Sequence, residues 1–269
     1  MTTDAEARLR FAIDLARRAG ELGMTYFRAL EKLTIESKGH QDLVSDGDRE
    51  VELFVRREIA AVYPDDSIVG EEHAPAQGTS GHVWIIDPID GTANFVRGIP
   101  AWCVVIACSR EGVAHTGVVH EPATGETFYA RRGGGAFVNE KPIAVSTARS
   151  LSEGSVGVGF NNRTSAENVV PLIASIIADG GVFFRNASGA LMLAYVSAGR
   201  LIGYAEEHMN AWDCVAALLI VEEAGGRIFA PDPLTVIASG TLVLAAGPGV
   251  YDRIHDLSAA AFSPQASRS

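Results

Sequence analysis

The sequence predicts a layered α/β protein in which two sheets share one compact unit. Strand-like segments follow one another early in the chain, whereas helices and strands alternate in its second half. Alternation of this kind is typical of helices packed in layers against sheets. With 269 residues, 47% of them hydrophobic, the chain can bury a substantial core. We place an internal boundary near residue 150, which gives an N-terminal part at 1–150 and a C-terminal part at 151–269.

The N-terminal part begins with two amphipathic helices. Apolar residues recur at helical spacing over 5–30, which predicts a long first helix. A second helix is expected over 48–62, where acidic residues precede an apolar stripe and Pro64 ends the pattern. Runs of apolar residues bounded by turn residues then predict strands at 67–70, 83–87, 102–109 and 113–119.

The C-terminal part alternates short apolar strands with helices. We expect helices near 165–178, near 189–199 and over 211–224, with a last helix towards the end of the chain. The strands between them are short apolar runs, namely SVGVG, VFF, LIGY, RIF and LVLAA. This order again predicts helices layered on a sheet.

The composition argues against some classes of binding partner. The net charge of -11 and the absence of a Lys/Arg block argue against binding to nucleic acid. No apolar run approaches the length of a membrane span, and the first ten residues lack a secretory signal pattern, so we expect a cytoplasmic protein without membrane contact. The cysteines, Cys103, Cys108 and Cys214, are widely spaced and odd in number, which predicts buried reduced thiols.

The segment WIIDPIDGTANF at 84–95 runs an apolar strand into two carboxylates, Asp87 and Asp90. Asp-Pro and Asp-Gly pairs are ordinary turn formers, so a simple turn is the alternative explanation of this segment alone. Helix caps or solvated strand ends are likewise the alternatives for the other places where acids border an apolar element. These are DLVSDGD at 42–48, SIVGEEH at 67–73 and AWDCVAALLIVEEAGG at 211–226.

Taken together, these acids predict a cation site. Burying even one unpaired carboxylate costs several kcal/mol, and a compact fold would bring several of them together. A hard cation such as Mg²⁺ resolves the conflict, because it prefers carboxylate and carbonyl oxygens. Gly91 lets the backbone approach a ligand, and a helical turn starting near Thr92 would offer N–H groups to an anion. A metal beside such N–H groups suits a phosphate.

These motifs resemble the inositol monophosphatase family of Mg²⁺-dependent, lithium-sensitive phosphatases. The resemblance covers the chain from Lys38 to Gly226, with the motifs in the family's order. It implies a five-layer αβαβα sandwich of the inositol monophosphatase and fructose-1,6-bisphosphatase type, a site at the junction of its two parts, and a homodimer. The segments that carry it are DLVSDGD, GEE at 70–72, WIIDPIDGTANF, RRGGGAFVNEKPIAVS at 131–146 and WDCVAALLIVEEAGG at 212–226.

The resemblance also implies the roles of individual residues. Thr92 and Asp48 would orient the attacking water, Glu72 would assist, and the N–H groups of Gly91 and Thr92 would bind the phosphate. Two to three Mg²⁺ ions would be held by Glu71, Asp87, the carbonyl of Ile89, Asp90 and Asp213. The alcohol side of the substrate would contact Ala187, Ser188, Gly189, Glu206 and Asp213.

Three positions near the expected substrate depart from the family's common pattern. Ala187 stands where Gly is frequent, Met192 where Asp or Asn is frequent, and Asn210 precedes Ala211 and the Trp-Asp pair. Met192 is explained most simply as a residue of the helix core. We expect a small sugar or polyol phosphate as substrate, with inositol-1-phosphate as the first candidate.

The alternatives fall into two classes. Within the superfamily they are phosphatases acting on histidinol phosphate, fructose-1,6-bisphosphate or a 3'-phosphonucleotide, all of which would share the metal acids. The alternative of another class is a regulatory protein that binds transcription or ribosome factors. The complete set of acids favours catalysis over that role.

Overall fold

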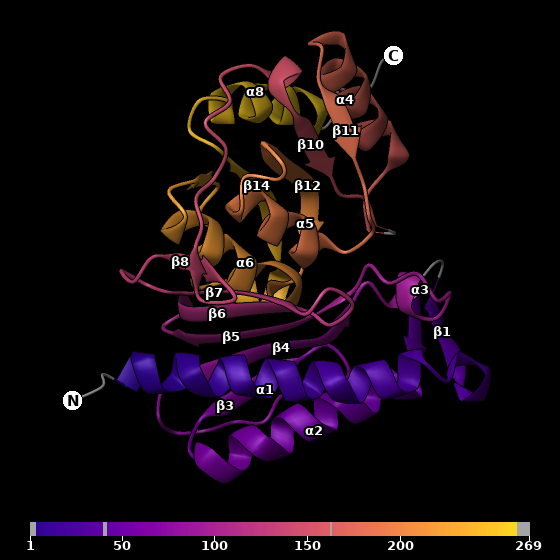
Figure 1. Ribbon diagram of the computed structural model, residues 1–269, viewed down its shortest axis with the longest axis vertical. Coiled ribbons are helices and arrows are strands. Elements are labelled where there is room, and N and C mark those ends of the chain that lie inside the picture. Colours follow the sequence, from indigo (N-terminus) through magenta and orange to yellow (C-terminus); the bar gives the residue numbers. More distant parts are fainter. Residues whose placement is uncertain (1–3, 40–41, 162, 263–269) are drawn as a thin grey trace.

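The structure is a computed structural model that describes residues 4–39, 42–161 and 163–262. Helices and sheets alternate in layers, from bottom to top in Figure 1. The first layer contains α1 (Asp4–Phe27) and α2 (Asp46–Val62). The second is a seven-stranded sheet, ordered β3 (Ser67–Gly70), β4 (His82–Asp90), β5 (Cys103–Arg110), β6 (Val113–Glu121), β7 (Glu126–Arg131), β8 (Ala136–Val138) and β9 (Lys141–Pro142).

A helical layer separates this sheet from a second one. It contains α5 (Gly189–Ser197) and α6 (Ala211–Glu223), which contact both sheets. α4 (Ala166–Ala178) and α8 (Tyr251–Phe262) cover the outer face of the second sheet. This arrangement confirms the five-layer αβαβα sandwich. The strands of the second sheet are ordered β11 (Val182–Phe184), β10 (Ser155–Val158), β12 (Gly203–Met209), β14 (Thr241–Ala246) and β13 (Arg227–Ile228).

The apolar run of β4 is explained by its position between two helical layers. Ile86 belongs to the core under α1 and α2, whereas Ile85 belongs to the core around α5 and α6. Both side chains are almost fully buried, and each such burial contributes about 1.5–3 kcal/mol. A strand covered on both faces is apolar on both faces, so this run does not alternate with polar residues.

β4 extends further than the sequence predicts, to Asp90 instead of residue 87. Its pairing with β5 has a register shift between Asp87 and Asp90, because Pro88 has no N–H to donate to the ladder. Beyond this bulge Asp90 lies opposite Cys103. The bulge therefore places both carboxylates at the same end of the sheet.

Several short elements were not predicted. They include the hairpin of β1 (Ile35–Gly39) and β2 (Asp42–Ser45), and α7 (Val236–Ser239). The helical turn expected near Thr92 is present as α3 (Thr92–Phe95). α1 also ends at Phe27, before the expected residue 30, because the next residues form a turn and a 3₁₀ segment.

The first sheet ends at Pro142, and the second begins at Ser155. The division of the chain into parts at 1–150 and 151–269 stays a prediction. The three cysteines are buried free thiols, as expected. Among the residues that the structure describes, no helix combines the length and apolarity needed to cross a membrane.

Candidate active site

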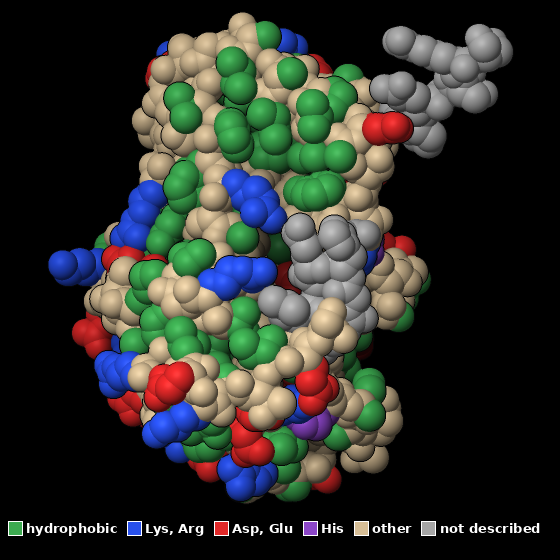
Figure 2. Space-filling view, turned by 90° about the vertical axis from the view of Figure 1, so that its right-hand side faces the viewer, with side chains coloured by type: hydrophobic (Ala, Val, Ile, Leu, Met, Phe, Trp, Pro, Cys, Tyr) green, Lys and Arg blue, Asp and Glu red, His purple; other side chains and the backbone are tan. Residues whose placement is uncertain are grey.

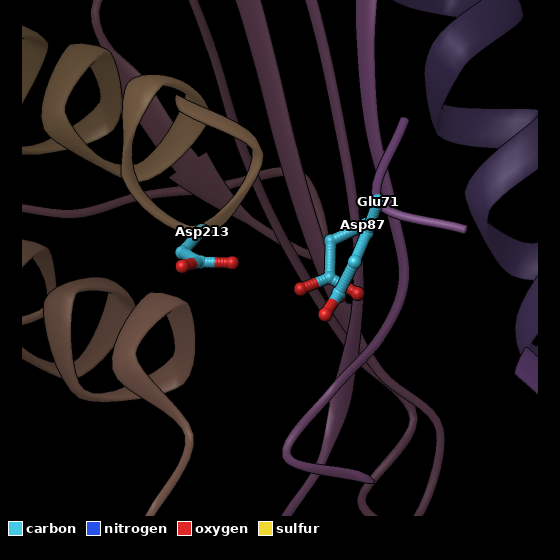
Figure 3. A group of neighbouring side chains, drawn as sticks. All are labelled: Glu71, Asp87 and Asp213. Atoms are coloured by element: carbon cyan, nitrogen blue, oxygen red, sulfur yellow. The ribbon is translucent and has the colours of Figure 1, made fainter. Parts of the chain in front are cut away.

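Three carboxylates meet at the end of the first sheet. β3 and β4 are parallel neighbours with Gly70 opposite Ile86, so the next residues, Glu71 and Asp87, lie side by side. Asp213, in the first turn of α6, points at them from the helical layer (Figure 3). One carboxylate oxygen from each of the three lies within 4.8 Å of the others. The structure thus brings together acids from three distant segments.

The electrostatics of this group favour a bound cation. Burial raises the pKa of Asp87 well above its usual value, and the nearby charges of Glu71, Asp90 and Asp213 raise it further. Burial, with the charge of Asp90, also raises the pKa of Asp213 to about 8. Converging oxygen donors that repel one another are the ligand set that a hard divalent cation prefers, so this set fits Mg²⁺.

A cavity of about 150 Å³ opens at these carboxylates. Asp48, Glu72 and Ser188 were also expected at the site but do not form part of its wall. Among the described residues, the wall is formed by Glu71, Asp87, Ile89, Asp90, Gly91, Thr92, Gly159, Phe160, Asn161, Arg163, Arg185, Ala187, Gly189, Met192, Tyr204, Glu206, Met209 and Asp213.

Asp90 connects the first sheet to the helical layer. Its Oδ2 accepts hydrogen bonds from Ser188 Oγ at 2.6 Å and from the backbone N–H of Ala190 at 2.8 Å, at the start of α5. Burial raises the pKa of Asp90, and these two hydrogen bonds oppose the increase. Ser188 is fully buried. Its position shows a contact with Asp90 and gives no support for the substrate contact expected of it.

Thr92 links the cavity to Asp48. Thr92 Oγ1 lies 2.9 Å from Asp48 Oδ1 and 3.1 Å from the carbonyl oxygen of Ile89. The other oxygen of Asp48 accepts from the N–H of Ser45 at 2.8 Å and from its hydroxyl at 2.6 Å, in a capping box at the start of α2. Burial raises the pKa of Asp48, against the effect of these hydrogen bonds. Asp48 therefore both caps the helix and holds Thr92.

The opposite wall of the cavity contains a buried carboxylate, Glu206. Asn161 Nδ2 donates to Glu206 Oε1 at 2.8 Å, and the hydroxyl of Tyr204 donates to Oε2. Burial raises the pKa of Glu206 to about 7. Neither partner was predicted from the sequence. The period of two along a strand could have indicated Tyr204, because it shares a face with Glu206, whereas no local pattern pointed to Asn161.

Arg163 and Arg185, which were not predicted either, bring positive charge to a cavity that is otherwise acidic. Arg163 lowers the pKa of Asp213 against the larger effect of burial. Arg185 donates from Nη2 to the carbonyl oxygen of Phe160 at 3.0 Å. This wall can therefore attract an anionic group of a ligand.

The departures from the family pattern have structural consequences. Ala187 has a φ of 63°, a left-handed conformation that costs a residue with a Cβ about 1–2 kcal/mol. Gly is free of this cost, which explains why it suits the position. Met192 is 2% exposed and packs in the core, as expected, while it also contributes to the cavity wall.

The fold and the site define a phosphatase of the layered α/β class. The chain belongs to the inositol monophosphatase family, whose model matches residues 4–265.

Individual relatives carry several different names. The chain is 40% identical over 226 residues to the fructose-1,6-bisphosphatase/inositol-1-monophosphatase of Thermotoga maritima, which covers 82% of this chain and 84% of the relative. It is 36% identical over 218 residues to the Nus factor SuhB of Xylella fastidiosa, covering 80% and 79% of the two chains. A crystal structure of the extragenic suppressor protein suhB of Bartonella henselae superposes with a TM-score of 0.88 at 30% identity, covering 94% and 98%.

Proposed function

We propose that this protein is a Mg²⁺-dependent phosphomonoesterase of the cytoplasm. Its substrate is a small sugar or polyol phosphate, with inositol-1-phosphate as the first candidate. The observation that carries the proposal is the convergence of Glu71, Asp87 and Asp213, whose oxygens lie within 4.8 Å of one another at the cavity. Family membership supports the same chemistry.

The proposed metal ligands are those expected from the sequence. Glu71, Asp87, Asp90, Asp213 and the carbonyl of Ile89 all line the cavity and would hold two to three ions. Bound Mg²⁺ supplies Lewis acidity, which lowers the pKa of water and stabilises charge on the phosphate and the leaving oxygen.

Thr92 and Asp48 provide a path for a proton. A water in the cavity donates a hydrogen bond to Thr92 Oγ1, and Thr92 in turn donates to Asp48 Oδ1. This chain orients a lone pair of the water towards the phosphorus and lets Asp48 take up the proton. Gly91 and Thr92 line the cavity, and their N–H groups bind phosphate oxygens in this proposal. Glu72, next to Glu71, assists as a further acceptor.

The alcohol part of the substrate contacts the cavity wall that contains Glu206. Glu206 accepts a hydrogen bond from a substrate hydroxyl, and Ala187, Gly189 and Asp213 complete the contact surface. Ser188 contributes indirectly, because it fixes Asp90.

A second candidate substrate is fructose-1,6-bisphosphate. It is favoured by Arg163 and Arg185, because they line the cavity and can bind a second phosphate group. The name of the Thermotoga relative includes both activities. The name of the Xylella relative supports a regulatory role as the alternative of another class.

A panel of phosphate esters tests these proposals. Inositol-1-phosphate, fructose-1,6-bisphosphate, histidinol phosphate and a 3'-phosphonucleotide are each assayed for phosphate release with Mg²⁺ and with a chelator. We expect release to require Mg²⁺ and to be fastest with inositol-1-phosphate. Preference for another ester changes the substrate, whereas no release from any ester contradicts the phosphatase proposal. Lithium is expected to inhibit, and flat activity across a lithium titration would contradict that expectation.

We also propose that the protein is a homodimer. Figure 2 shows hydrophobic side chains gathered in the upper part of the molecule, over α4 and the edge strand β11. Val170, Ile177, Val182 and Phe183 are 59%, 54%, 61% and 43% exposed there. A contiguous apolar patch of this kind is typical of an interface, and a second copy would cover it. Sedimentation at the mass of a single 28.4 kDa chain would contradict the dimer.

A further inference from the structure

Of the three converging carboxylates, Glu71 alone lies outside a helix or strand. Asp87 belongs to β4 and Asp213 to α6, whereas Glu71 follows the end of β3 in an irregular segment. A metal site requires its ligands at well-defined positions, and a ligand on irregular backbone needs support from its surroundings. The contacts of residues 71–74 therefore matter for the site.

A buried glutamate of α2 holds this segment by its N–H groups. The side chain of Glu52 is fully buried. Its Oε2 accepts from the backbone N–H of Glu72 at 2.7 Å, and its Oε1 accepts from the N–H of His73 at 3.2 Å. Hydrogen bonds to a charged acceptor are stronger than those between neutral groups. They fix the backbone directly after Glu71.

Arg56, one helical turn after Glu52, holds the same segment by its carbonyl groups. Its Nε donates to Glu52 Oε1 at 2.6 Å. Its Nη2 donates to the carbonyl oxygen of His73 at 3.0 Å, and its Nη1 donates to that of Ala74 at 3.1 Å. The planar guanidinium thus joins the Glu52 carboxylate to the backbone in one rigid arrangement.

Gly70 makes room for this arrangement. A Cβ at residue 70 would collide with the carboxylate of Glu52. The glycine before Glu71 therefore has a packing function, since it lets the carboxylate approach the backbone. The pair was not predicted, because a Glu and an Arg four residues apart are typical of an exposed helix face.

We propose that Glu52 and Arg56 are positioning residues that fix the place of Glu71 and so set the affinity for Mg²⁺. This inference rests on the proposed metal-dependent function. Neither residue lines the cavity, so both act through the backbone of residues 72–74. Loss of a group that orients a metal ligand typically lowers metal affinity about 10–100-fold.

Two variants and a control test the inference. Glu52→Gln keeps the shape but replaces one acceptor oxygen by an NH₂ group that faces N–H donors, and Arg56→Lys removes the planar fork. The control is Glu58→Gln, because Glu58 lies on the same helix and pairs with Arg18 at 2.7 Å, away from the segment. Mg²⁺ is titrated into each protein by calorimetry, and phosphate release is measured against Mg²⁺ concentration.

We expect Glu52→Gln to lower Mg²⁺ affinity about tenfold or more, and Arg56→Lys to lower it less. Turnover of both variants should recover at saturating Mg²⁺, with an unchanged substrate KM, which a general loss of structure would not allow. The control should match the wild type. Circular dichroism verifies folding. If Glu52→Gln does not fold, the Mg²⁺ affinity of Arg56→Lys tests the inference by itself.

The titrations separate two kinds of failure. A wild-type protein that binds no Mg²⁺ would overturn the proposed function and, with it, this inference. A wild-type protein that binds Mg²⁺ while the folded variants bind it equally well would overturn only the inference.

Discussion

Replacing Asp87 by Asn is expected to abolish phosphate release and, without Mg²⁺, to raise the melting temperature. Asp87 is almost fully buried, and the neighbouring Glu71, Asp90 and Asp213 make its ionised form unfavourable. Asn keeps the volume of the side chain and removes the charge. The folded state therefore loses a repulsion, and the proposed Mg²⁺ site loses one of its ligands.

The loss of kcat/KM should be at least about 10³-fold, or about 4 kcal/mol of transition-state stabilisation. The gain in melting temperature should be several degrees in chelator, since about 1 kcal/mol shifts a chain of this size by roughly 2–4 °C. In Mg²⁺ the wild type should have the higher melting temperature, because a ligand stabilises only a protein that binds it. Differential scanning calorimetry in chelator and in Mg²⁺ measures both effects.

Asp14→Asn is a suitable control for this experiment. Asp14 lies on α1 and pairs with Arg18 at 2.9 Å at the surface, where such pairs contribute about 0–1 kcal/mol. Neither activity nor the response to Mg²⁺ should change. An Asp87→Asn protein with wild-type turnover would contradict the proposed site.

The same repulsion determines how stability depends on pH in chelator. Asp87 and Asp213 have raised pKa values in the folded protein, with Asp213 at about 8. At these two carboxylates the folded state therefore binds protons more tightly than the unfolded state, and their contribution to stability falls as the pH rises from about 4 towards 8. This fall should be shallower in Asp87→Asn, as denaturant titrations across this range would measure.

Replacing Thr92 by Val is expected to lower kcat by about 10²–10⁴-fold, the usual contribution of a positioned acid or base. Val keeps the branched shape but removes the hydroxyl that lies 2.9 Å from Asp48. Water in the cavity then has no hydrogen-bonded path to that carboxylate. Affinity for Mg²⁺ should be largely retained, because the side chain of Thr92 is not among the proposed ligands.

Thr92→Ser is the matched variant, since it keeps the hydroxyl and loses one methyl group. It should retain most of the activity. Phosphate release at saturating Mg²⁺ and calorimetric Mg²⁺ binding measure the two effects separately. Equal activity in the Val and Ser variants would show that the hydroxyl has no part in the reaction.

The layered fold could be predicted because its main elements have strong local patterns. The helical spacing before residue 27 and the apolar run before Asp87 each report one element and its burial. The acids that border apolar elements indicated a common site, because burying several unpaired carboxylates is costly without a cation. The order of the motifs indicated the family. The local pattern was sufficient for both the helix and the strand, because the helix is buried along one face and the strand is buried on both faces.

The remaining parts depend on contacts between distant segments. Asn161 reaches Glu206 across 45 positions of sequence, and Glu52 reaches Glu72 across 20. No periodic pattern links such pairs, because each side chain fits its own element equally well without the other. The extension of β4 through Pro88 was missed for a different reason, since a proline normally ends a strand.

The late position of Asp213 in the sequence determines when, during synthesis, the three acids can come together. During synthesis, Glu71 and Asp87 leave the ribosome well before residue 213 of the 269. Until residue 213 has been made, the three acids cannot bind an ion together. We therefore expect Mg²⁺ to occupy the proposed site only after residue 213 has been made, and a cellular shortage of Mg²⁺ to lower the activity of completed molecules without reducing the amount of protein that folds.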